Sequence, residues 1–247
     1  MGTANCFSCM SPLLKNLEAK ELTDEKIRDF KRVVLAQLGV LISLFLLELF
    51  SWLKFALYLE LAETIFFLAI GVYAFLLWDM LRNYTSSRRI VVLNFIFIMG
   101  VFVAGFICVN PFWPMPLSIP YRTMLVIIQT SLLTVECFVI WFTIREFFKR
   151  ELGLPIKLWG AAAMYMMIGM SFGSIYEILC VLQLDCLGIE VPLRTIAMMK
   201  RVGFSFMILC GIDTPYNITP LISSLTTVEA LFSEIFIVLI VGRFLVR

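Results

Sequence analysis

The sequence predicts an all-α integral membrane protein, and three observations lead to this class. Of the 247 residues, 61% are hydrophobic and 15% are charged, whereas soluble domains average about 45–50% and about 25%. The mean hydropathy is +0.96. Six apolar runs each reach the length of about 20 residues that a bilayer-spanning helix needs. These runs leave no room for a separate soluble domain.

The six runs are predicted as transmembrane helices over residues 33–53, 55–81, 90–109, 123–144, 158–183 and 221–242. Proline supports these limits, because all nine prolines lie outside the runs or at their edges, as expected where no water can satisfy a broken helix. The five tryptophans lie near predicted span ends, where the half-polar indole ring prefers to be.

Lysine and arginine predict the orientation. An even number of spans places both termini on one side, and that side carries 15 of the 20 basic residues. The positive-inside rule therefore predicts a multi-pass protein of the cell membrane with both termini in the cytoplasm. Residues 1–32 form a cytoplasmic tail, in which charges of both signs and regularly spaced leucines predict an amphipathic helix. This helix could lie on the membrane surface or continue the first span inward.

The connection over residues 184–220 is much longer than the others and contains a moderately apolar stretch, 202–212. This stretch is too short to cross a bilayer. It is interpreted as an external loop or as a re-entrant helix that enters the membrane partway. The second interpretation would imply a pore, because irregular backbone at membrane depth is tolerated where it lines water.

Carboxylates inside apolar runs are the main anomaly, because an acid at the centre of a bilayer helix costs about 2.5–3.5 kcal/mol. Four lie within two turns of span ends, where they can reach the headgroups, and four lie deeper, where pore lining or pairing between helices is expected. The first group is Glu48, Glu60, Glu63 and Asp79, and the second is Glu136, Glu177, Glu229 and Glu234. Gln129, Ser131 and Thr134 in the fourth span are expected to bond to other helices. Gly169 and Gly173 predict close helix packing.

Several activities are disfavoured. The chain has no histidine, and it lacks the phosphate-binding, dinucleotide-binding and hydrolase motifs, so no enzyme activity, cofactor or metal site is predicted. A net charge of +2 does not indicate a nucleic-acid partner. The sequence leaves open whether Gly2, Cys6 or Cys9 is lipidated, and whether Cys180, Cys186 and Cys210 are paired.

The C-terminal region carries a family resemblance. Phe204-Ser205-Phe206, Ile218-Thr219-Pro220 and the run from Val228 to Arg243 resemble the pore helix, the post-filter segment and the inner helix of bacterial potassium channels of the two-helix pore superfamily. The resemblance implies a four-helix region without a voltage sensor over residues 33–157, and a pore-like domain over residues 158–247. The latter would hold an outer helix, a re-entrant segment and an inner helix.

Within this resemblance, the filter falls on Gly211, Ile212, Asp213, Thr214, Pro215, Tyr216 and Asn217. Thr214, Pro215 and Tyr216 stand where the family has Gly-Tyr-Gly. Because carbonyl coordination of potassium relies on backbone conformations that glycine reaches easily, the sequence predicts an altered pore without strict potassium selectivity. On the inner helix, Glu229 matches the family pattern, while Ser233 and Glu234 replace its glycine and glutamine.

The resemblance implies a homotetramer in the lipid bilayer that conducts monovalent cations, with Asp213 and Glu234 forming acidic rings. Two alternatives are kept. The fold could persist without conduction, as a scaffold or as a subunit that modifies a related channel, because the filter glycines are missing. A secondary transporter is less favoured, because the sequence shows no inverted repeats.

Overall fold

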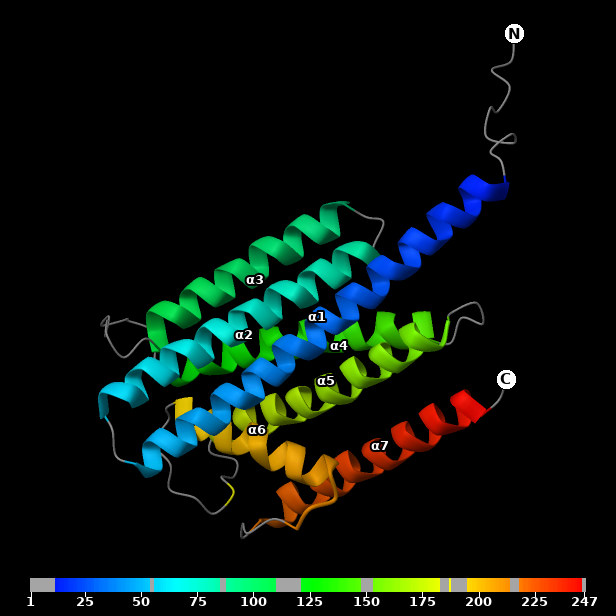
Figure 1. Cartoon of the computed structure of the whole chain (residues 1–247). Coiled ribbons are helices and arrows are strands. Elements are labelled where there is room, and N and C mark those ends of the chain that lie inside the picture. Colours follow the sequence, from blue (N-terminus) through cyan, green and yellow to red (C-terminus); the bar gives the residue numbers. More distant parts are fainter. Residues whose placement is uncertain are drawn as a thin grey trace.

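The computed structural model describes residues 12–53, 56–84, 88–109, 121–147, 153–182, 187, 195–213 and 218–245, and within them the chain is entirely helical (Figure 1). The helices are α1 (Pro12–Trp52), α2 (Ala56–Tyr84), α3 (Arg88–Val109), α4 (Tyr121–Phe147), α5 (Leu154–Val181), α6 (Thr195–Leu209) and α7 (Pro220–Leu245). The predicted all-α class is confirmed.

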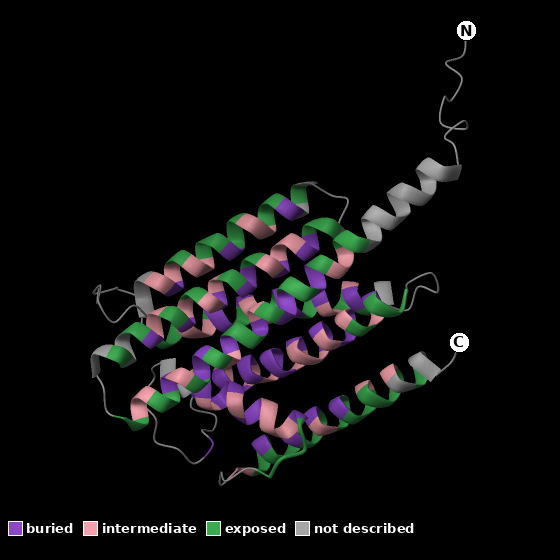
Figure 2. Ribbon diagram, viewed as in Figure 1, coloured by how far each residue is buried: buried purple, intermediate pink, exposed green. Residues whose placement is uncertain are grey.

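In the described part of the chain, five helices are long and apolar enough to cross a membrane, namely α1, α2, α4, α5 and α7. The described apolar part of α3, Val91–Phe106, is shorter than this criterion requires. A multi-pass membrane protein is therefore supported by five spans, and the sixth span, which corresponds to α3, stays a prediction. Exposed positions follow the outer faces of the helices (Figure 2). Many of the exposed residues are large and apolar, among them Leu35, Phe45 and Trp141, as expected of a surface in contact with lipid.

The main core lies where α1, α2, α4 and α5 meet, and it includes Leu47, Tyr73, Leu77, Val139 and Met164. Helix α5 packs against α1, α4 and α6. Small residues on α5 permit this crowding, since glycine and alanine let helix backbones approach closely. Helix α5 is consequently the central element of the fold.

Helix α1 is longer than the first predicted span. It has 41 residues, which corresponds to about 61 Å, roughly twice the hydrocarbon thickness. Of the two predicted possibilities for the tail, the structure has the one in which the helix continues past the span. At the junction, the Phe30 ring lies against Gly160, Lys31 Nζ lies 5.3 Å from the Trp159 ring centre, and both partners belong to α5.

Two local signals in the sequence fix helix ends. Pro12, Pro155 and Pro220 lie at the starts of helices, where the missing N–H costs nothing. Helix α6 ends in a Schellman motif, in which Gly211 N–H donates to the Ile208 carbonyl at 3.0 Å and Ile212 N–H donates to the Met207 carbonyl at 2.9 Å. Gly211 has φ +68°, a conformation that glycine adopts without strain.

Helix α6 runs antiparallel to α5 in a groove that glycines open. A Cβ atom added at Gly173 would lie 3.0 Å from Val202 Cα, and one at Gly169 would lie 2.7 Å from Leu209 Cδ1. The predicted packing role of the two glycines is confirmed. Helix α6 has 15 residues and is about 22 Å long, so it covers only part of α5.

Helix α7 also runs antiparallel to α5, so α6 and α7 point the same way. Tyr176 contacts Glu229, whereas Tyr165, further back on α5, contacts Ser233. The end of α6 therefore lies level with Ser233, because Ser233 Oγ is 2.9 Å from the Leu209 carbonyl oxygen. Helix α7 begins at Pro220, thirteen positions earlier, or about 20 Å along its axis. The end of α6 and the start of α7 therefore lie at different levels of the bundle, with ten residues between them in the sequence.

Candidate functional site

A fully buried polar cluster joins α5, α6 and α7 around Glu229, which is 0% exposed. Tyr176 Oη on α5 donates to Glu229 Oε2 at 2.7 Å. Ser205 Oγ on α6 donates to Glu229 Oε1 and also lies 2.7 Å from the Gly169 carbonyl oxygen. One carboxylate on α7 is thus held by hydroxyl groups of two other helices, which fixes the mutual rotation of all three.

A second contact between α5 and α6 is an ion pair. Arg201 Nη1 donates to Glu177 Oε2, and both side chains are almost fully buried. Removing two charges from water is costly, so a buried pair holds only while both partners are present. Glu177 lies one position after Tyr176 on α5. The ion pair and the Glu229 cluster therefore hold the same turn of α5 against α6 and α7.

The C-terminal end of α6 is also held in place by hydroxyl groups. Tyr165 Oη on α5 and Ser233 Oγ on α7 both donate to the Leu209 carbonyl, at 2.7 and 2.9 Å. This carbonyl belongs to the last turn of α6, where backbone acceptors have no intrahelical donor. The level at which α6 stops is therefore specified by side chains of both neighbouring helices.

Glu136 on α4 forms a separate cluster between α2, α4 and α5. Tyr73 Oη donates to Glu136 Oε1 at 3.0 Å, and Ser171 Oγ donates to Oε2 at 2.9 Å. Glu136, Glu177 and Glu229 are thus all paired with other helices of the same chain. Pairing was one of the two roles predicted for these deep carboxylates, and none of the three is positioned to line a pore.

The polar residues of the fourth span behave differently from the prediction. Ser131 Oγ and Thr134 Oγ1 donate to carbonyls of α4 itself, those of Ile127 and Thr130, at 2.6 and 2.7 Å. Short hydroxyl side chains in a helix reach the carbonyl four positions earlier, so the expectation of bonds to other helices is wrong for both. Gln129 does leave the helix, since its Nε2 lies 3.3 Å from Met198 Sδ on α6.

The residues singled out by the channel resemblance divide into two groups. Glu229 and Ser233 are buried on the face of α7 that meets α5 and α6, whereas Glu234 is exposed on the other side. Gly211, Ile212 and Asp213 are exposed after the end of α6. The rest of the predicted filter lies outside the described residues, namely Thr214, Pro215, Tyr216 and Asn217. The structure therefore describes only its first three residues.

The carboxylates near span ends have mixed environments. Glu48 is exposed, and its reach to the headgroups stays a prediction. Asp79 Oδ1 instead forms an ion pair with Arg82 Nη2 at 2.8 Å, one turn further along α2. Glu63 is half-buried, and the side chain of Glu60 lies outside the described part. Among the described residues, no three His, Cys, Asp or Glu side chains gather closely enough to hold a metal ion.

Of the three cysteines whose pairing the sequence left open, Cys180, Cys186 and Cys210, two can be placed. Cys210 is exposed beside Gly211 and carries no disulfide, and Cys180 is buried near the end of α5. Cys186 lies outside the described residues, as do Gly2, Cys6 and Cys9. The lipidation question thus falls on a part of the chain that the structure does not describe.

Comparison with known proteins adds no relative. No protein-family model matches the chain. No curated protein and no solved structure matches it either. The functional conclusion therefore rests on the residues and on their geometry.

Proposed function

We propose that the protein is an ion-channel-like membrane protein that conducts monovalent cations through an altered pore, which is not strictly selective for potassium. The observation that carries this proposal is the register of α6. This helix enters the bundle beside α5, ends level with Ser233 of α7, and is followed by a connection that returns to the start of α7. We interpret this order, a short helix followed by a return to the start of the next span, as a re-entrant segment, which would be tolerated at membrane depth if it borders a water-filled space.

The exposed face of α7 supports the same proposal. Ser224, Thr227 and Glu234 are all exposed and follow one another at spacings of three and seven residues, so they share one face of the helix. Glu234 lies in the middle of α7, where an acid in contact with lipid would cost about 2.5–3.5 kcal/mol. Water in a central pore would remove this cost, and a carboxylate there would favour cations.

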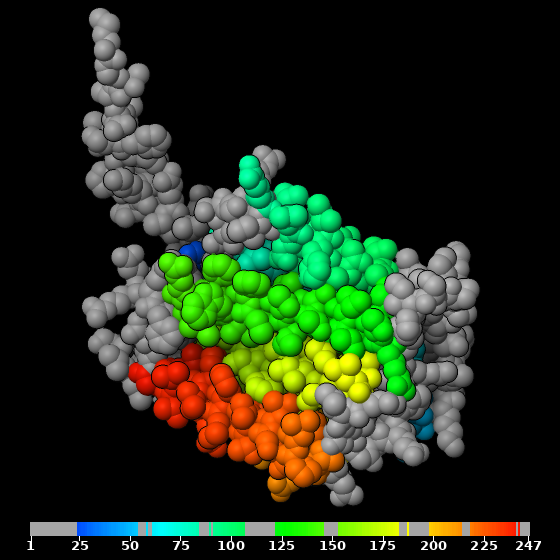
Figure 3. Space-filling model, turned by 180° about the vertical axis from the view of Figure 1, so that it is seen from behind, coloured from blue at the N-terminus to red at the C-terminus, as the bar shows by residue number. Residues whose placement is uncertain are grey.

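A closed ring of subunits is needed to enclose such a pore. Figure 3 shows α7, coloured orange to red, along the edge of the molecule, with α5 and α4 on one side only. The surface of α7 that no other helix covers carries apolar side chains, including Leu231, Ile235 and Val238, each more than half exposed. We expect four copies to meet along α6 and α7, in the cell membrane and with both termini in the cytoplasm.

Flux through purified protein tests the proposal. The full chain, reconstituted in liposomes, should pass potassium and sodium down a gradient, and Asp213→Asn or Glu234→Gln should lower the rate. Glu48→Gln is the matched control, because Glu48 is an exposed carboxylate of α1, away from the proposed pore. Absence of flux under every gradient, together with no effect of Asp213→Asn, would overturn conduction. Native mass spectrometry in detergent should show four subunits.

The non-conducting alternative is favoured by one feature. The exposed apolar face of α7 could pack against a related channel subunit as readily as against a second copy, and Thr214, Pro215 and Tyr216 stand where the resembled family has Gly-Tyr-Gly. Co-purification with a distinct channel subunit would support this alternative. Cation flux from the homomer alone would count against it.

A further inference from the structure

The hydrogen bonds around Glu229 need one more hydrogen atom than its neighbours supply. Ser205 Oγ lies within hydrogen-bonding distance of two oxygen atoms, Glu229 Oε1 and the Gly169 carbonyl oxygen, the second at 2.7 Å. A serine hydroxyl group has a single hydrogen, and a backbone carbonyl has none to give. If Glu229 is ionised, the two contacts must therefore share one hydrogen.

A proton on Glu229 completes the set. The protonated Oε1 donates to Ser205 Oγ, and the hydrogen of Ser205 is then free to donate to the Gly169 carbonyl oxygen. Tyr176 Oη donates to Glu229 Oε2 at 2.7 Å, and this atom is the carbonyl oxygen of the neutral acid. Each polar atom of the cluster then has a hydrogen bond of its own, as buried polar groups normally do.

The charges around the cluster favour the same state. Glu229 and Tyr176 are both 0% exposed. The titratable groups at this level of α5 are Tyr176 and Glu177, and Arg201 is the buried basic residue of α6, one turn before Ser205. Arg201 donates to Glu177, so this pair adds no net charge to offset an ionised Glu229. A buried charge that is not offset is costly, and a carboxyl group in such a place takes up a proton instead.

We propose that Glu229 is a proton-binding site, which holds a proton as a neutral carboxylic acid while α7 is packed against α5 and α6. Release of this proton to water would leave a charge buried where the three helices meet. The hydrogen of Ser205 would again have to serve two oxygen atoms. Loss of the proton should therefore loosen α7 from α6. The proposal does not depend on ion conduction.

Infrared spectroscopy of the full chain tests for the proton. The protein would be purified at neutral pH in dodecyl maltoside, a detergent without carbonyl groups, so that the C=O stretching bands of protonated carboxylic acids can be seen beside the amide bands. Glu229→Gln should remove one such band. Asp79→Asn is the control and should remove none, because Asp79 is paired with Arg82 at 2.8 Å and should be ionised. A spectrum in which Glu229→Gln leaves these bands unchanged would overturn the site.

Tyr176→Phe keeps the test decisive if Glu229→Gln does not fold. This variant leaves the carboxyl group in place and removes the hydrogen bond to Oε2, so the band should move to higher frequency. A band at the same frequency as in the unchanged protein would overturn the assignment to Glu229. A band that appears only in Tyr176→Phe would show that Glu229 is ionised in the unchanged protein, which also overturns the site.

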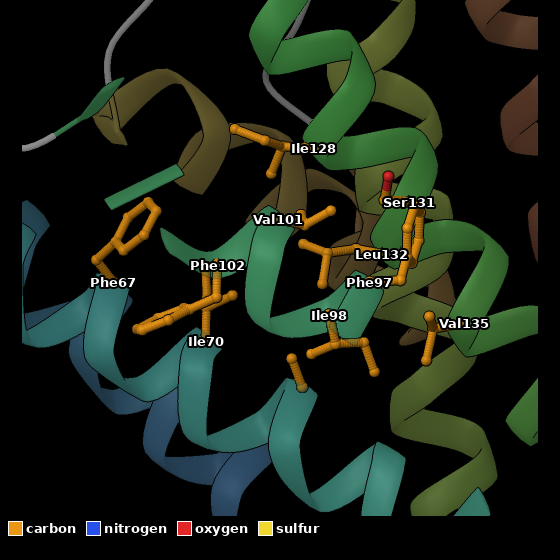
Figure 4. Close-up of a pocket in the computed structure, with 11 residues that line it drawn as sticks. Phe67, Ile70, Phe97, Ile98, Val101, Phe102, Ile128, Ser131, Leu132 and Val135 are labelled. Carbon is orange, nitrogen blue, oxygen red and sulfur yellow. The ribbon is translucent and has the colours of Figure 1, made fainter. Parts of the chain in front are cut away.

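Hydrogen exchange followed by mass spectrometry tests the effect of proton release. The pH is raised in steps until the infrared band is lost, and exchange in α6 and α7 should then be faster in the unchanged protein than in Glu229→Gln, because glutamine stays neutral. Helix α3 is the internal reference and should exchange alike in both, since it packs against α2 and α4 through apolar side chains such as Ile98 and Phe102 (Figure 4). Equal exchange in α6 and α7, or a band that persists until the whole protein unfolds, would overturn the role of the proton in holding α7.

Discussion

The Glu229 cluster allows a sharp prediction about what holds α6 and α7 together. Glu229→Gln keeps an oxygen that accepts from Tyr176 and supplies an N–H group that can donate to Ser205. Glu229→Leu has a similar volume but leaves Tyr176 Oη without its acceptor, at a position where the tyrosine is 0% exposed. Ser205 keeps a partner in either variant, because its hydroxyl lies 2.7 Å from the Gly169 carbonyl oxygen.

The expected magnitudes follow from this count of hydrogen bonds. A single buried hydroxyl without a partner costs about 1–3 kcal/mol, and bonds between membrane helices contribute about 0.6–1.7 kcal/mol. Glu229→Leu should therefore lower the free energy of unfolding by about 1–3 kcal/mol. Glu229→Gln should change it by less than about 1 kcal/mol, because it loses no hydrogen-bonded pair.

Unfolding in mixed micelles, followed by circular dichroism as the share of denaturing detergent rises, measures these differences. Adding Tyr176→Phe to Glu229→Leu should cost little more, since the hydroxyl that lost its acceptor is then removed. Two results would refute the reasoning. One is a Glu229→Leu variant as stable as the unchanged protein, and the other is a Glu229→Gln variant that is less stable than Glu229→Leu.

Two further predictions concern the contact between α5 and α6 and use the same unfolding measurement. Arg201→Met should lower the free energy of unfolding by about 3–5 kcal/mol, because it leaves Glu177 buried and unpaired. Adding Glu177→Leu should restore most of this stability. A double variant as unstable as the single one would contradict the prediction. Gly173→Leu should cost at least about 1–3 kcal/mol, because its Cβ would meet the backbone of α6 at Val202 Cα. Gly203→Ala is the control, since no atom lies within 4 Å of an added Cβ there. This variant should be as stable as the unchanged protein or more stable by about 0.5–1 kcal/mol. Similar losses of stability in Gly173→Leu and Gly203→Ala would contradict the close packing of α6 against α5.

Much of the helical layout was predictable from the sequence, because bilayer length and proline positions constrain it strongly. The predicted span 221–242 lies within α7 (Pro220–Leu245), and the stretch 202–212 overlaps the short α6. The start of α6 was missed by seven residues, since Thr195 to Arg201 contains two basic residues and does not look apolar. The burial of Arg201 depends on Glu177, a partner 24 residues away.

The polar partners were less predictable than the helices. The deep carboxylates could be recognised as needing partners, because an acid inside a bilayer helix is costly. Which residue pairs with which depends on the rotation of each helix, and apolar patterns say little about rotation when both faces are apolar. Glu229 and Glu234 show this clearly: they lie five positions apart in the same apolar run, yet one is buried and the other exposed.

The ion pair between Glu177 and Arg201 can form only after a delay during biosynthesis. Its two members are 24 residues apart, with the acid made first. At a synthesis rate of about 5–20 residues per second, Arg201 is added to the chain about one to five seconds after Glu177. Glu229, made later still, completes the cluster only when the last helix leaves the ribosome. Helix α5 therefore cannot reach its final environment on its own, because the Glu177 carboxylate gains its Arg201 partner only once α6 has been made.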